Sequence, residues 1–305
     1  MLDPIDSSSQ QFLVAMDGLN KRLEQAQQRI TSGLKIQIAS DAPDQISQLL
    51  QVRSQIAQNQ QTKSNLASYK LEEDSASNAL QQASTVLDSV KALSSTALNG
   101  TLSPTMQANL VQEVEGYMQD IVGIANTQAN GRYVFSGNND QTAPFALDLT
   151  QANGVTPYAG AAATRTAQSP DGSSFPLALS GNDIFNSPNS GESVFSALSS
   201  LRQGLLANDS SMIQGAMAQV QSAQGHLSNE QSFYGTAQSR VGQATSFADT
   251  INNQLQDQLS SIQDADITSS ILELQDVEFQ RSAALSARAK VPPTSLFNYI
   301  GSTSG

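Results

Sequence analysis

Residues 213–262 read IQGAMAQVQSAQGHLSNEQSFYGTAQSRVGQATSFADTINNQLQDQLSSI and carry an apolar side chain at every seventh position. The eight positions are Ile213, Val220, Leu227, Tyr234, Val241, Ala248, Leu255 and Ile262. This spacing is typical of a long helix with one buried stripe, and it predicts a left-handed supercoil. The column four residues further on is mostly polar: Met217, Gln224, Gln231, Gln238, Thr245, Asn252 and Leu259. A free-standing dimeric coiled coil needs both columns apolar, so we expect this helix to pack on other helices of its own chain.

Further helices are predicted on both sides of this stretch. Segments 10–31 and 265–300 are amphipathic, and the second follows Asp264-Ala265-Asp266 and is interrupted by Pro292-Pro293. Segment 44–98 has an apolar seam that is interrupted by Glu73 and Ser94. A third helix is expected to begin at Ser103-Pro104, an N-cap followed by proline, and to end at Asn130-Gly131. Helix is expected to resume near Ser193.

The predicted fold class is mainly α, an elongated antiparallel helical-bundle rod with a small β-rich inserted domain. Helices 44–98 and 213–262 would each span about 80 Å, so they can lie alongside one another. Residues 131–195 hold seven glycines and five of the ten prolines, and no helical period survives there. We interpret this part as short strands and turns around a small core of Phe135, Phe145, Phe175 and Phe185. Because the long helices flank this insert, we expect it at one far end of the rod.

Composition excludes several classes of function. The formal charge of −12 disfavours contact with the phosphate backbone, so no nucleic-acid partner is expected. The chain has no cysteine, which excludes disulfides and thiolate metal sites. No stretch approaches the roughly 18 apolar residues of a membrane span, and no membrane partner is expected. The start, Met1 to Asp6, holds two acids and no base, so no cleaved signal peptide is expected.

A catalytic or cofactor site is not predicted. His226 is the single histidine, and a solvated or hydrogen-bonded helix residue explains it better than a metal ligand. The acidic run Glu72-Glu73-Asp74 is interpreted as a solvated helix face rather than an acid–base pair. No nucleotide-binding glycine motif occurs. We therefore expect no enzyme, no metal and no cofactor. The alternative left open is an enzyme whose β-rich insert carries a catalytic or carbohydrate-binding site.

The order of these elements resembles the flagellin and hook–filament junction superfamily of bacterial flagella. The strings that carry the resemblance are 32–36 (SGLKI), 40–43 (SDAP), 99–103 (NGTLS), 130–137 (NGRYVFSG), 143–145 (APF), 181–186 (GNDIFN) and the stretch 271–300. The 130–137 string is most similar to the junction members. The chain departs from the family at Leu2-Asp3-Pro4, at Ala42 where a second Asp is usual, and at Pro292-Pro293, which puts the register of the terminal contacts in question.

The resemblance implies a structural subunit of the flagellum, a junction adaptor between the hook-associated ring and the filament; a filament flagellin is the alternative. It implies three regions: 1–43 with 263–305, an inner-layer assembly domain that is disordered in the monomer; 44–131 with 193–262, the rod; and 132–192, a surface insert. Implied partners are other copies of the chain, the first hook-associated protein, flagellin and an export chaperone of the FlgN type. The location implied is the extracellular flagellum, reached by type III export. The expected assembly interface is Phe12, Met16, Leu19, Leu23, Ile30, Ile271, Leu274, Val277, Leu285, Leu296, Phe297, Tyr299 and Ile300.

Overall fold

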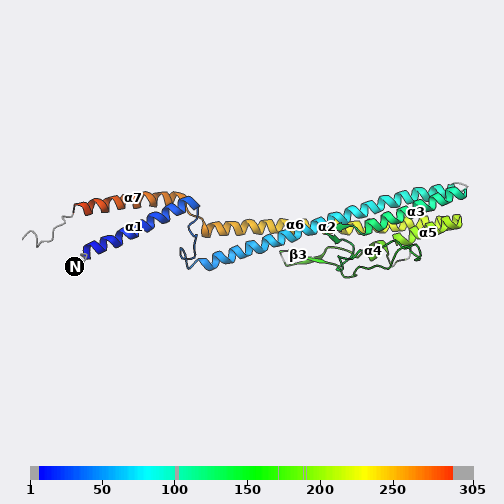
Figure 1. Cartoon of the computed structure of the whole chain (residues 1–305), viewed down its shortest axis with the longest axis horizontal. Coiled ribbons are helices and arrows are strands. Elements are labelled where there is room, and N and C mark those ends of the chain that lie inside the picture. Colours follow the sequence, from blue (N-terminus) through cyan, green and yellow to red (C-terminus); the bar gives the residue numbers. More distant parts are fainter. Residues whose placement is uncertain (1–6, 100–102, 171, 188, 190, 291–305) are drawn as a thin grey trace, which may run out of the picture. The chain divides into compact units, whose positions relative to one another are not determined.

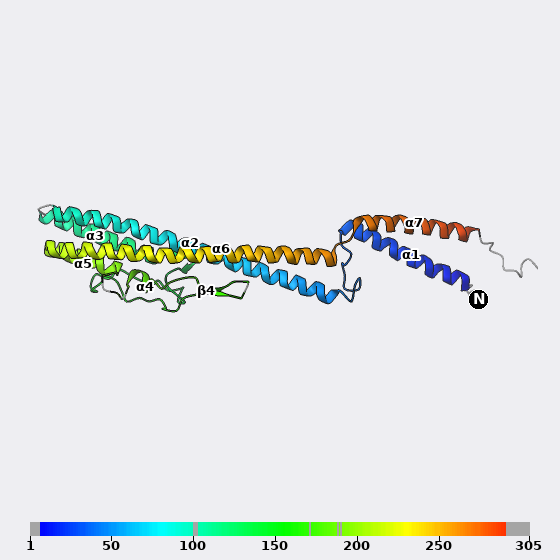
Figure 2. The same cartoon turned by 180° about the vertical axis from the view of Figure 1, so that it is seen from behind.

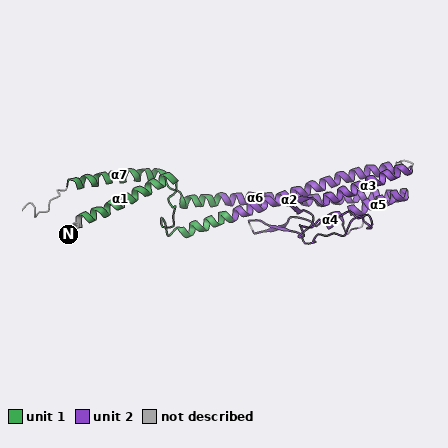
Figure 3. Cartoon of the chain, viewed as in Figure 1, with its two compact units in different colours: residues 1–57, 253–305 green, residues 58–252 purple. Residues whose placement is uncertain are grey.

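The computed structural model describes residues 7–99, 103–170, 172–187, 189 and 191–290 (Figure 1). Its helices are α1 (Ser7–Ser32), α2 (Ile46–Asn99), α3 (Pro104–Ala125), α4 (Gly181–Phe185), α5 (Val194–Ala207), α6 (Ser210–Gln263) and α7 (Ile267–Ala289). Its strands are β1 (Gln128–Ala129), β2 (Arg132–Tyr133), β3 (Thr166–Gln168) and β4 (Ser174–Pro176). The chain forms two compact units, residues 1–57 with 253–305 and residues 58–252 (Figure 3). Among the described residues, no helix combines the length and apolar character needed to cross a membrane.

Within the unit 58–252, α2 and α6 run antiparallel (Figures 1 and 2). Three hydrogen bonds fix their register: Asn59 Nδ2 donates to the Ala248 carbonyl at 2.8 Å, Gln238 Nε2 to Asp74 at 3.0 Å, and Gln224 Nε2 to Asp88 at 2.7 Å. α3 and α5 add further helices to this bundle and contact each other. The predicted pairing of the two long helices is confirmed.

The heptad stripe of α6 is buried in its own chain, as predicted, since seven of its eight residues are at most 7% exposed and Leu255 is half-buried. The second buried column was not anticipated. It lies three residues after the stripe rather than four, and its members are Ala216, Ala223, Ala237 and Ala244. Alanine fills little space, so the neighbouring helices can approach α6 closely on this side. The mostly polar column four residues on is half-buried throughout.

The predicted end of the third helix at Asn130-Gly131 is wrong. α3 begins as predicted, with Ser103 Oγ accepting a hydrogen bond from the Met106 amide and with proline at its first position, but it ends at Ala125. Asn130 and Gly131 both have positive φ, 52° and 74°, and form the two-residue loop between β1 and β2. Two consecutive positive φ angles match a tight hairpin turn, which explains why this dipeptide serves a hairpin here.

A second turn divides the helix expected from Ser193 onward. Ser193 is the N-cap of α5, but Asn208 adopts the left-handed conformation at φ 52° and ends that helix before α6 begins. Asparagine tolerates this conformation better than most residues, so no glycine or proline marks the break. A Cβ added at Gly204 would lie 3.0 Å from the Ile213 amide nitrogen, so the packing at this turn is tight.

The insert shares its core with the helices. Phe135, Phe145 and Phe185 are at most 2% exposed, and their rings contact one another and Phe195 of α5 at centroid distances of 4.9–6.5 Å. The fourth predicted core residue, Phe175, instead joins a separate cluster with Leu66 of α2 and Val241 of α6. The insert therefore packs along the side of the bundle, where α2 and α6 supply much of its apolar contact.

The unit that holds both chain ends has its own small core. Ile36 packs with Leu49 and Val52 of α2 and Ile262 of α6. The segment between α1 and α2 is ordered by polar contacts: the Asp41 carboxylate accepts hydrogen bonds from the amides of Gln37 and Ile38 at 2.8 and 2.9 Å. Both bonds lower the pKa of Asp41, and the bond from Ile38 has the larger effect.

Candidate assembly interface

Helices α1 and α7 lie side by side, so the two amphipathic segments at the ends of the chain pair with each other (Figure 2). Asp266 is the N-cap of α7, and its carboxylate accepts a hydrogen bond from the Ser269 amide at 3.1 Å. This bond lowers the pKa of Asp266 below its ordinary value. The local sequence thus fixes where α7 begins, directly after the last turn of α6.

The stripe predicted on α1 faces α7. Its five members are half-buried: Phe12, Met16, Leu19, Leu23 and Ile30. Ala26 on the same stripe is fully buried. On α7, Val277 is fully buried and Leu274 is half-buried, so both lie on the covered side. A two-helix pair covers only one side of each helix, which leaves most of its large apolar side chains partly exposed.

Charged side chains border this contact. Glu273 of α7 pairs with Arg29 at 3.1 Å and with Arg22 at 3.5 Å, and both arginines come from α1. Towards the chain ends, Arg288 lies 5.7 Å from the centroid of the Phe12 ring and donates a hydrogen bond to Ser9 Oγ at 2.6 Å. Partly exposed ion pairs contribute about 0–1 kcal/mol each, so they orient the two helices more than they hold them together.

Two of the predicted interface residues on α7 are more exposed than Leu274 and Val277. Ile271 and Leu285 are 41% and 48% exposed. At 100° per residue, their side chains point about 120° and 80° away from that of Val277. Four further predicted interface residues lie outside the described residues, as do Pro292-Pro293: Leu296, Phe297, Tyr299 and Ile300.

A second apolar surface was missed in the sequence. Leu272 and Phe279 of α7 are 61% and 71% exposed, and Leu13 and Val14 of α1 are 57% and 74% exposed. Phe279 projects about 200° from Val277, so α7 carries apolar residues on opposite sides. The sequence carries a signal for this surface, because Leu272 and Phe279 are seven residues apart and form a second stripe on the same helix. We call Ile267, Ile271, Leu272, Phe279 and Leu285 the outer surface of α7.

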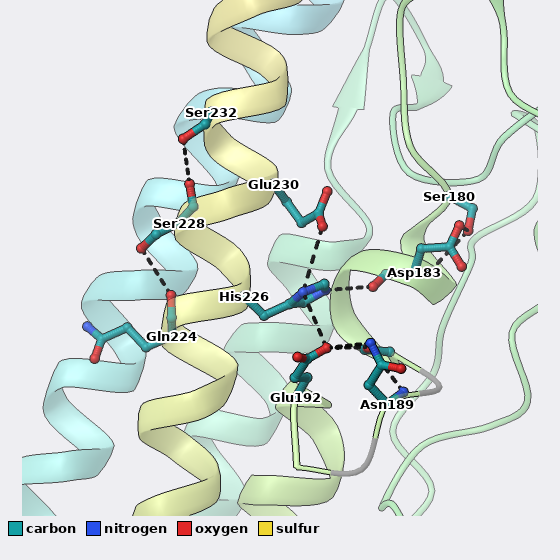
Figure 4. Close-up of polar contacts among 10 residues, drawn as sticks. Ser180, Asp183, Asn189, Glu192, Gln224, His226, Ser228, Glu230 and Ser232 are labelled. Carbon is teal, nitrogen blue, oxygen red and sulfur yellow. Dashed lines mark hydrogen bonds and ion pairs between the residues drawn. The ribbon is translucent and has the colours of Figure 1, made fainter.

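His226, which lies outside this interface, makes contacts that serve the fold. His226 Nε2 donates a hydrogen bond to the Asp183 carbonyl at 2.8 Å, and its Nδ1 lies 3.7 Å from Glu230 and 3.8 Å from Glu192 (Figure 4). The interpretation of His226 as a hydrogen-bonded helix residue is confirmed. Within the described ranges, no group of three or more histidine, cysteine or acidic side chains is arranged to hold a metal ion.

The interpretation of Glu72-Glu73-Asp74 as a solvated face is wrong for its central residue. Glu73 is only 2% exposed, because it lies on the side of α2 that faces the insert and α6. Glu72 is half-buried and pairs with Arg165 of the insert at 2.9 Å. The acidic run therefore lies at the contact between bundle and insert.

Comparison with known proteins identifies the helical ends of the chain. Residues 7–140 match the model of the bacterial flagellin N-terminal helical region, and residues 217–300 match that of the C-terminal helical region. Flagellar hook-associated protein 3 of Escherichia coli K12 is 28% identical over 163 residues, 52% of this chain and 49% of that protein. The protein of the same name from Salmonella typhimurium LT2 is 29% identical over the same shares. The chain thus spans about half the length of the curated relatives it matches.

A solved structure supports the fold. The crystal structure of Xanthomonas campestris FlgL superimposes with a TM-score of 0.57 at 17% sequence identity, covering 69% of this chain and 99% of that one. At this identity the likeness concerns the fold alone, a helical bundle with a small β-containing part. The two family matches together include α1, α2, α3 and α7, most of α6 and the first residues of the insert. The chain belongs to the bacterial flagellin family.

Proposed function

We propose that the chain is a structural subunit of the bacterial flagellum that acts as an adaptor at the junction of hook and filament. The observation that carries this proposal is the α1–α7 pair, whose outer surface leaves Leu272 and Phe279 mostly exposed. Large apolar side chains gathered on one exposed surface mark a site of association. Both curated relatives are named flagellar hook-associated protein 3, which supports a place next to the hook rather than along the filament.

The assembly would use both sides of the terminal helices. Phe12, Leu19 and Leu23 of α1 would pack against α7, and the outer surface of α7 would contact neighbouring copies. Fully burying one such leucine or phenylalanine side chain contributes roughly 1.5–3 kcal/mol. Because the contact repeats around a closed assembly, a modest energy for each copy is sufficient to favour the assembled state. The apolar tail residues Leu296, Phe297, Tyr299 and Ile300 are proposed to extend this interface.

The proposed partners are other copies of the chain, the first hook-associated protein on one side and flagellin on the other. We further propose that a chaperone of the FlgN type covers the C-terminal segment before export, and that the chain reaches the outside of the cell without a cleaved signal peptide. In this role the chain is a structural protein and not an enzyme.

Electron microscopy of cells that lack this chain tests the proposal. A junction adaptor predicts hooks without filaments, with flagellin monomers released into the medium. The second candidate, a filament subunit, is kept because the matched family model is named for flagellin. If the chain is a filament subunit, cells that lack it should carry normally attached filaments that miss one component. The purified chain should then grow long polymers on filament seeds. Normal flagella in the mutant would contradict both candidates.

A further inference from the structure

Glu73 lies in the buried apolar seam of α2, at a position where an apolar side chain is expected. It lies between Tyr69 and Ala76 on the buried side of the helix and is only 2% exposed. Within the described part of the chain, neither of its carboxylate oxygens has a hydrogen-bond partner. A buried carboxylate without a partner is strongly unfavourable in its charged form. Neither the helical bundle nor the assembly interface explains a glutamate at this position.

The space beside Glu73 is closed by three parts of the same compact unit. α2 contributes Tyr69 and Glu72, α6 contributes Tyr234, and the insert contributes Val134, Arg165 and Leu177. The cavity has a volume of about 10 Å³, room for about one water molecule. No organic ligand or hydrated ion fits such a space. The insert is also tied to α6 here, because the Leu179 amide donates a hydrogen bond to Tyr234 Oη at 3.3 Å.

The cations near Glu73 are engaged elsewhere. Arg165 pairs with Glu72 at 2.9 Å and lies 3.9 Å from Asp140 of the insert, and its Nε is buried without a partner. On α2, Lys70 pairs with Asp74 at 3.1 Å. Each cation therefore already faces another carboxylate.

The remaining titratable groups do not compensate a charge on Glu73. On α6, the buried Tyr234 faces the cavity. The negative charge of Glu230, on the same helix, acts on Tyr234. Burial, reinforced by the neighbouring Asp74 carboxylate, raises the pKa of Glu73 to about 8. The geometry thus favours the neutral carboxyl over the carboxylate.

We propose that Glu73 is a proton-operated latch: with a proton bound, its carboxyl lets the β3–β4 part of the insert and α6 close over α2, and proton loss loosens the insert. The ligand of this site is the proton itself. The latch is a property of the unit 58–252 and does not depend on the proposed role at the junction.

The direction of the pH effect follows from linkage. When the insert opens, Glu73 meets water and regains its ordinary pKa of 4.5, while in the closed form the pKa is about 8. Between these values the closed form holds one more proton than the open form. The equilibrium constant for opening therefore rises about tenfold for each pH unit up to about 8 and levels off above it. Acidic conditions favour the closed insert, and alkaline conditions loosen it.

Amide hydrogen exchange of the full chain from pH 6 to 9.5 tests the latch. Protection factors of β3 and β4, corrected for the intrinsic effect of pH on exchange, should fall about tenfold per unit up to pH 8 and then become constant. Glu73→Gln, which is neutral at all pH values, should show no such slope. The matched control is Asp120→Asn, which changes an exposed carboxylate of α3 in the same compact unit and should behave as wild type.

A flat wild-type profile, or an equal slope in Glu73→Gln, would overturn the proposal. If Glu73→Gln does not fold, carboxyl ¹³C NMR of wild-type Glu73 decides instead. A titration midpoint near pH 8 supports the latch, and a midpoint near the ordinary glutamate value of 4.5 overturns it.

Discussion

Replacing Phe279 by alanine should disrupt assembly without unfolding the chain that carries it. Phenylalanine buries roughly 150–250 Å² when fully covered, and 71% of the Phe279 side chain is still exposed in the single chain. An interface that covers this part would bury about 105–180 Å². At about 25 cal/mol per Å², and allowing for the β-carbon that alanine keeps, the loss is about 2–4 kcal/mol for each copy.

A loss of about 3 kcal/mol corresponds to roughly a 100-fold weaker contact between neighbouring subunits. The assay is complementation: cells whose only copy is Phe279→Ala are scored for attached filaments by electron microscopy and for flagellin in the medium. We expect few attached filaments and abundant free flagellin. Circular dichroism and the thermal midpoint of the purified variant should equal those of wild type, because Phe279 does not lie on the covered side of α7.

The matched control is Val277→Ala, two residues away on the same helix and fully buried. It should lower amide protection across α7 by weakening the contact with α1, a change that Phe279→Ala should not produce. Wild-type numbers of filaments on Phe279→Ala cells would contradict this prediction, because the outer surface of α7 would then not be an interface.

Three further predictions concern the described fold. Leu87→Ala, in the fully buried seam of α2, should lower the free energy of unfolding by about 2–5 kcal/mol, whereas Leu71→Ala, at a position 48% exposed on the same helix, should change it little. Urea unfolding curves of unchanged slope measure both free energies. Equal midpoints for the two variants would contradict the burial of this seam. Gly137→Ala places a Cβ 2.1 Å from the Ala161 carbonyl oxygen at φ +60°, so faster amide exchange in the insert is expected and wild-type exchange would count against this packing. The charged Asp266 cap stabilises the folded chain above the ordinary pKa of 3.8, and this stabilisation is lost as the pH falls through the lower pKa of Asp266 in the folded chain. The amide protection of Ser269 should therefore drop in that acidic range. Asp266→Ala should show the low protection at every pH.

The helices were predictable because the signals that define them are local. The stripe from Ile213 to Ile262 follows from helical periodicity, and caps such as Ser103, Ser193 and Asp266 act on amides within three residues of themselves. The pairing of the two chain ends was also within reach, since both ends carried an apolar stripe. The resemblance to the flagellin family, drawn from short strings in a fixed order, is confirmed by the family matches.

The amino-acid sequence by itself determined the lengths of the long helices and the existence of their apolar stripes. Only the tertiary structure decided which faces are covered: Asn130-Gly131 could have ended a helix but closes a hairpin, and Glu73 could have faced water but faces the insert. The exposure of Phe279 and the choice of the alanine column on α6 were decided in the same way. The physical reason is that periodicity records how side chains are spaced along a helix, whereas burial depends on which other segments, far away in the chain, pack against each side of it.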